Sequence, residues 1–145
     1  MLAKVNNLVQ SIVFKLDPFI KLYLRLFIGF VFVPAGWGKL HNLKDTIEFF
    51  QSLNIPAPQI QAPFVACVEF GLGLCVALGL FTRLATIPLM GTMIVALLTA
   101  HAKDITDINS LLDQTPFCYL TVLVAILALG GGSISLDKFI NKSAK

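Results

Sequence analysis

Glu69 is the residue of this chain best suited to chemistry, because it is a single carboxylate inside a long apolar segment. Residues 62–80 contain no other charged side chain, and the segment is long enough to cross a bilayer. A carboxylate at such a depth is costly unless it is paired, protonated or in contact with water. Glu69 is therefore the first candidate for a ligand-binding or proton-transfer residue.

A preceding apolar segment supplies cations for Glu69. At 100° per residue, one stripe of a helix over residues 19–39 carries two cations and two glycines: Arg25, Gly29, Gly36 and Lys39. Charges avoid lipid and glycines let helices approach closely, so this stripe should face another helix. The Glu69 face of residues 62–81 is also small, with Gly73 and three alanines. We expect the two faces to meet, with the three glycines as packing residues.

The partner of Glu69 stays open at this stage, because the helical rise puts Arg25 and Lys39 each about 10 Å away along the membrane normal. Arg25 lies deeper and stays charged, whereas Lys39 can extend to the interface. We therefore expect Arg25 to be mainly structural and Lys39 to line a polar pocket with Glu69. The competing interpretation is an ion pair that only locks two helices. The pocket is favoured because one cation would suffice for a lock.

Other candidate residues gather around this pattern. Trp37 and His101 should lie near the membrane surface at the Lys39 end, so both are counted as ligand-binding candidates. The competing interpretation is that each is an ordinary residue of the membrane interface. Arg83, in a tight turn, is expected to fix packing and topology. The sequence contains no metal-ligand spacing, phosphate loop or Ser/His/Asp set, and its three cysteines form no Cys-x-x-Cys motif. No metal and no intrinsic cofactor are expected.

The composition indicates an integral membrane protein. Of the 145 residues, 57% are hydrophobic and 13% are charged, whereas about a quarter are charged in an ordinary soluble domain. The mean hydropathy is +0.83. The net charge of +3 is too small to indicate a nucleic-acid partner. The expected partner is the lipid bilayer.

The hydrophobic pattern predicts an all-α membrane protein, a bundle of four transmembrane helices. Each span has nearly the roughly 20 residues that a bilayer requires, and the spans are expected at residues 19–39, 62–81, 84–102 and 116–134. Before them, residues 1–17 have the pattern of an amphipathic helix lying in the interface. Asp17 and Pro18 predict the start of a new helix.

The domain division follows from these spans. It consists of the interfacial helix 1–17, a transmembrane domain 18–135 and a short tail 136–145. Seven lysines and arginines flank the spans on the side of the termini and three flank them on the other side. Because the more basic side faces the cytoplasm, both termini and the tail are expected there.

Several short motifs follow one another along residues 22–134. They are Arg25 to Gly29, Gly36-Trp-Gly-Lys39, Phe49-Phe50, Pro56-x-Pro58, Glu69 with Gly71 and Gly73, and Gly79 to Arg83. In this order they resemble the DoxX family of small bacterial membrane proteins. The resemblance implies a four-helix bundle in the bacterial inner membrane. It also implies an association with membrane redox systems, because founding members resemble a subunit of a thiosulfate:quinone oxidoreductase.

Two classes of function follow. In the first, the protein is an accessory subunit that holds a quinone or a small thiol compound near Arg25, Lys39 and Glu69. A redox-enzyme partner then supplies the electrons, because the chain has no redox centre of its own. In the second, it is a non-catalytic scaffold, an assembly factor or a small-solute carrier, and transport would require a homo-oligomer. A co-purified quinone favours the first class, whereas solute flux in liposomes favours the second.

Overall fold

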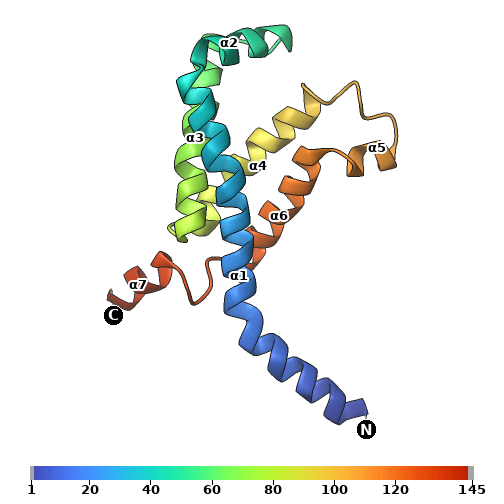
Figure 1. Cartoon of the computed structure of the whole chain (residues 1–145), viewed down its shortest axis with the longest axis vertical. Helices are drawn as coiled ribbons and strands as arrows, with labels where there is room; N and C mark the ends of the chain where they lie inside the picture. The colour runs from blue at the N-terminus through green and yellow to red at the C-terminus, as the bar shows by residue number, and fades with distance from the viewer. Residues whose placement is uncertain (1, 144–145) are drawn as a thin grey trace.

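The computed structural model of the chain describes the backbone of residues 2–143 and, apart from residues 2–5, 7, 8, 12 and 141–143, their side chains. Over this range the chain is all-helical. In chain order the helices are α1 (Leu2–His41), α2 (Leu43–Ser52), α3 (Pro58–Leu78), α4 (Thr82–Leu98), α5 (Ile108–Leu112), α6 (Thr115–Leu129) and α7 (Leu136–Ser143). α1 and α3 lie side by side, and α4 packs on α6 at an angle to them (Figure 1).

α1 is longer than the sequence predicts, and the predicted helix start at Asp17 is wrong. The helix runs through Asp17 and Pro18 without interruption, and Figure 1 shows that it bends in its N-terminal part. The Asp17 carboxylate accepts a hydrogen bond from Lys21 Nζ at 2.7 Å instead of capping a new helix. A proline inside a helix bends it rather than ending it when the flanking turns persist. The interfacial placement of residues 1–17 stays a prediction.

Glycines set the separation of α1 and α3. A Cβ atom built on Gly29 would lie 2.5 Å from the Ala77 Cβ atom, and one on Gly73 would lie 2.9 Å from the Phe32 Cβ atom. A Cβ atom on Gly36 would overlap the backbone of Phe70. The three glycines expected to pack thus lie where the two helices touch. Such close approach increases dispersion contacts, which drive helix association in a membrane.

The hydrophobic core lies where α1 and α3 pack against α4 and α6. Its fully buried side chains are aliphatic or aromatic and come from all four helices: Ile28, Phe32, Val76, Ala85, Leu89, Leu123 and Ile126. α3 ends at Leu78, and the φ of 72° at the next residue, Gly79, allows the tight turn into α4. That turn makes α3 and α4 antiparallel neighbours.

The helix lengths differ from the predicted spans. Among the described residues, α1 and α3 are long and apolar enough to cross a membrane, whereas α4 with 17 residues and α6 with 15 are shorter apolar helices. The spans expected to end at residues 102 and 134 end at Leu98 and Leu129. Gly130 follows the last residue of α6 with a φ of 73°, and a residue with a positive φ cannot continue a right-handed helix. Between α1 and α3 the chain forms the short helix α2.

Candidate functional site

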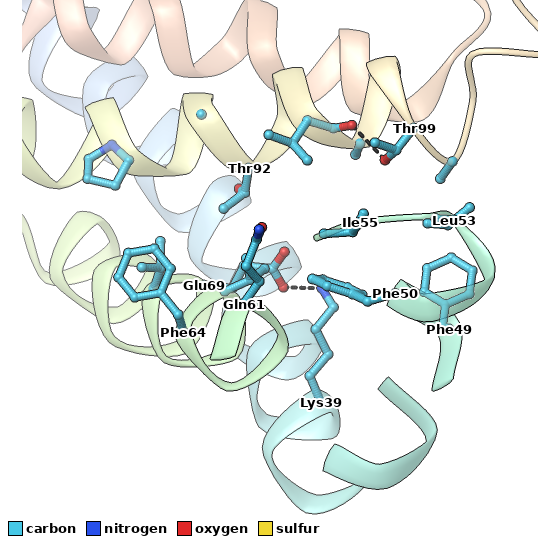
Figure 2. Close-up of a pocket in the computed structure, with 17 residues that line it drawn as sticks. Lys39, Phe49, Phe50, Leu53, Ile55, Gln61, Phe64, Glu69, Thr92 and Thr99 are labelled. Atoms are coloured by element: carbon cyan, nitrogen blue, oxygen red, sulfur yellow. Dashed lines mark hydrogen bonds and ion pairs between the residues drawn. The ribbon is translucent and has the colours of Figure 1, made fainter. Parts of the chain in front are cut away.

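The centre of the candidate site is an ion pair between α1 and α3. Lys39 Nζ, in the last turn of α1, donates a hydrogen bond to Glu69 Oε2 in the middle of α3. The Glu69 side chain is 4% exposed and that of Lys39 is 31% exposed. The pair therefore stands at the edge between the packed interior and an open space, as Figure 2 shows.

The local sequence explains why Lys39 reaches Glu69. Gly36 lies about one helical turn before Lys39, and its backbone packs on Phe70, the residue after Glu69. The two helices therefore touch closely beside the pair. The long lysine stem covers the remaining distance along the helix axis. The question left open by the sequence is settled geometrically, since Glu69 pairs with Lys39.

The ion pair lines a pocket of about 350 Å³ between α3, α4 and the α2–α3 connection. The walls are mostly apolar, and they include Phe49, Phe50, Leu53, Ile55, Phe64, Val65, Val68, Pro88, Gly91, Val95, Ala96 and Ala100. A few polar side chains join them, at Lys39, Gln61, Glu69, Thr92 and Thr99. Ligand sites combine an apolar wall with a few placed polar groups in this way.

The pocket reaches the outside of the helix bundle. Phe64 of α3 is 64% exposed, and Val95 of α4 is exposed as well. Both side chains line the pocket while facing outward, so the space opens between α3 and α4. Thr92 lies across this space from Glu69 (Figure 2). A molecule inside would have the ion pair on one side and a threonine hydroxyl on the other.

Arg25 lies at the other end of the molecule and takes no part in the pocket. Its side chain is buried, and Nη2 donates a hydrogen bond to the carbonyl oxygen of Ile134, between α6 and α7. The guanidinium packs against Gly79 so closely that a Cβ atom there would collide with it. Nε and Nη1 are buried without a hydrogen-bond partner in the described residues. The structure thus separates Arg25 from Lys39 and Glu69, which the sequence had grouped together.

Asp137 is a polar residue of this end that the sequence did not indicate. Its carboxylate accepts hydrogen bonds from Phe81 N at 2.6 Å, Thr82 N at 3.0 Å and Thr82 Oγ1 at 2.8 Å, which caps α4 from a distant part of the chain. Burial raises the pKa of Asp137, but the hydrogen bonds from Thr82 and Phe81 and the charge of Arg25 outweigh it and hold the pKa below its ordinary value of 3.8.

Trp37 and His101 lie outside the pocket. The exposed Trp37 ring packs on His41 at 4.0 Å and on Phe70 at 5.4 Å between ring centroids. His101 Nδ1 lies 3.9 Å from a carboxylate oxygen of Asp104. Neither of the two candidates lines the space beside Lys39. The described residues contain no group of three His, Cys, Asp or Glu side chains that could hold a metal ion.

The α4 wall of the pocket is the part that sequence reasoning missed. Pro88, Gly91, Thr92 and Val95 all line it. The sequence signal that could have indicated this wall was the spacing of Pro88, Gly91 and Thr92 on an otherwise apolar helix. Gly91 has no neighbouring atom within 4 Å of a Cβ position, so it widens the pocket rather than tightening a contact.

These features define an all-helical membrane protein with an ion pair, whose carboxylate is buried, at the edge of an apolar pocket. Residues 20–102 match the model of the DoxX family. The chain belongs to the DoxX family, as the motifs between Arg25 and Arg83 predict.

Curated relatives match the chain over most of its length. The inner membrane protein YqjF of Escherichia coli is 26% identical over 88% of this chain and 97% of its own. The protein named "Putative oxidoreductase CatD" of Bacillus subtilis is 32% identical over 86% of this chain and 89% of its own. The inner membrane protein YphA of Escherichia coli is 27% identical over 83% and 90%. No solved structure matches the chain significantly.

Proposed function

We propose that this protein is an integral membrane accessory subunit of a redox system, and that its pocket holds a small redox-active molecule, a quinone or a thiol compound. One observation carries the proposal: the Lys39–Glu69 ion pair lines an apolar pocket instead of being enclosed between helices. A pair that only locked α1 to α3 would need no adjacent space. The name of the similar CatD protein supports the redox association.

The pocket fits the polar end of such a molecule. Its volume of about 350 Å³ is at the small end of the range of roughly 300–1,000 Å³ for ligand sites, which suits a single ring or a short thiol compound. The Lys39 ammonium is a donor for a carbonyl or thiolate group, and the Thr92 hydroxyl stands on the opposite wall. An apolar tail would leave between Phe64 and Val95 toward the lipid. A bound quinone would supply the electron-transfer chemistry that the chain lacks.

In this proposal all four apolar helices α1, α3, α4 and α6 cross the inner membrane. The α7 end faces the cytoplasm, because the basic flanking residues concentrate there. Exposed positions allow a labelling test after the native cysteines are replaced. An impermeant thiol reagent applied to intact cells should label Asn42→Cys and Asn109→Cys and spare Lys138→Cys. The reverse pattern would contradict the orientation.

Ligand retention tests the pocket directly. The protein is extracted with mild detergent, and quinones and thiol compounds are quantified by mass spectrometry for the wild type and for Glu69→Gln. The exposed carboxylate of Glu48 on α2 provides the matched control Glu48→Gln. We expect the wild type and the control to retain one compound and Glu69→Gln to lose most of it. Equal retention in all three proteins, or none in the wild type, would refute the proposal, and solute flux in liposomes would then support a carrier.

A further inference from the structure

A second open site lies at the α7 end, far from the ion pair. It is a pocket of about 340 Å³ between the start of α4 and the end of α6. Its polar lining comes from Thr82, Arg83 and Asp137 and from the backbone of Gly130 and Gly131. Its apolar rim consists of the exposed side chains of Phe81, Leu84 and Leu129. A cation beside exposed apolar side chains at the end of two membrane helices suits an amphiphilic anion.

The Arg83 guanidinium has N–H donors left to bind such a ligand. Its guanidinium lies over Gly130, where a Cβ atom would stand 3.2 Å from Nε. Nη2 donates a hydrogen bond to the carbonyl oxygen of Ala128 at 3.1 Å, which fixes the side chain at the end of α6. This is the one hydrogen bond that the guanidinium makes within the described part of the chain. A guanidinium has five N–H donors and can bind two phosphate oxygens at once.

The repulsion between the Asp137 carboxylate and a bound anion is reduced by the groups that already contact this carboxylate. Asp137 already accepts hydrogen bonds from Phe81 and Thr82, and the charge of Arg25 lies near it. One further cation lies close to the pocket in the sequence, because the exposed Lys138 follows Asp137 directly.

We propose that the α4–α6 pocket at Arg83 binds the phosphate of an anionic phospholipid, with the acyl chains lying along Leu84 and Leu129. Basic pockets between membrane helices recognise anionic head groups by this combination of charge and apolar surface. The site is independent of the ligand proposed for the Lys39–Glu69 pocket. It also gives Arg83 a role beyond fixing topology.

The test compares phospholipids on the full chain in an uncharged detergent. Thermal stability is measured with added phosphatidylglycerol, with phosphatidylcholine of the same acyl chains and with inorganic phosphate alone. At about ten times the dissociation constant, phosphatidylglycerol should raise the Tm by about 5 °C, and the other two should have little effect. An equal rise with phosphatidylcholine would overturn the charge recognition. An equal rise with inorganic phosphate would overturn the assignment to a lipid.

Variants locate the effect. Arg83→Gln should lose most of the phosphatidylglycerol response, whatever its starting Tm, while Lys103→Gln at the opposite end keeps it. A purely structural Arg83 would change the starting Tm and leave the lipid response intact, which would refute the proposal. If Arg83→Gln does not fold, Arg83→Lys retains the charge without the planar fork and should show a weaker response. A wild-type Tm shift with phosphatidylglycerol in Arg83→Lys would contradict binding by the guanidinium. Equal Tm shifts with the two lipids in the wild-type protein would contradict recognition of the anionic head group.

Discussion

Lys39 and Glu69 form one ion pair but are buried to different degrees. The Glu69 side chain is 4% exposed, whereas the Lys39 side chain is 31% exposed and borders the pocket. If the pair opens, the ammonium can turn toward the pocket and the membrane surface, but the carboxylate stays in the packed interior. The lysine is therefore the mobile partner, and the glutamate is the fixed one.

This asymmetry predicts unequal effects of removing each partner. Lys39→Met leaves a buried carboxylate without a cation and should destabilise the protein by about 3–5 kcal/mol. Glu69→Gln should cost less, because the freed ammonium can reach water. A double-mutant cycle on thermal or denaturant unfolding measures both, and Lys39→Met with Glu69→Gln should recover part of the loss. Equal costs would contradict the asymmetry between the two partners, and strict additivity would show that they are not coupled.

The contact between Gly36 and Phe70 predicts a strong effect of a single methyl group. Gly36→Ala places a Cβ atom against the Phe70 backbone, which cannot move aside without separating α1 from α3, so we expect a loss of about 1–3 kcal/mol. Gly38, on the same helix, has no atom within 4 Å of its Cβ position. Gly38→Ala should be neutral or stabilise by up to about 1 kcal/mol. Similar melting temperatures for the two variants would disprove the close approach.

Arg25→Met should affect stability and leave the pocket unchanged. The variant loses the hydrogen bond to the Ile134 carbonyl and the positive charge near Asp137, which together should cost about 2–3 kcal/mol. Lys138→Met, which removes an exposed cation at the same end, is the control and should melt like the wild type. Ligand retention by Arg25→Met, measured at a temperature where it is folded, should match the wild type. Loss of the ligand without loss of stability would reverse this assignment.

The cap formed by Asp137 predicts a dependence on pH. Its pKa is below 3.8 in the folded protein, so the ionised form stabilises the fold above that pH, and the contribution disappears as the pH falls through the lower folded value. Asp137→Asn should therefore be less stable than the wild type at pH 7, by about 1 kcal/mol as for other helix caps. The difference in unfolding midpoint should shrink below pH 3.8. A difference that is constant down to pH 2 would show that the charge is irrelevant.

The faces of α1 and α3 that pack together could largely be predicted from the sequence, but the partner of Glu69 could not. Helical spacing placed Gly36 and Lys39 on one stripe, and the small residues around Glu69 marked the matching face. Both signals are local, because each depends only on the periodicity of one helix. Whether Arg25 or Lys39 pairs with Glu69 could not be predicted from one helix. It depends on how far α1 is shifted along its axis relative to α3. That shift is set by which glycine packs on which residue.

Other features depend on contacts between distant segments. Asp137 caps α4 although 55 residues separate it from Thr82, and nothing in a tail after three glycines indicates such a partner. α4 packs on α6 as well as on α3, so the pocket wall at Thr92 could not be derived from one helix. Pro18 predicted the start of a helix, but a proline also occurs inside a helix where the helix bends.

The unequal helix lengths have a consequence for the surrounding lipid. α4 and α6 are about 25 and 22 Å long at the standard rise per residue, and the hydrocarbon layer is about 30 Å thick. If both helices cross, we expect the bilayer to become thinner along this side of the protein. The mouth of the pocket lies between α3 and α4, so water and head groups come closer to it there than on the side of the longer helix α1. A lipid-soluble molecule could then place its polar end beside Glu69 without drawing that end through a full-thickness membrane.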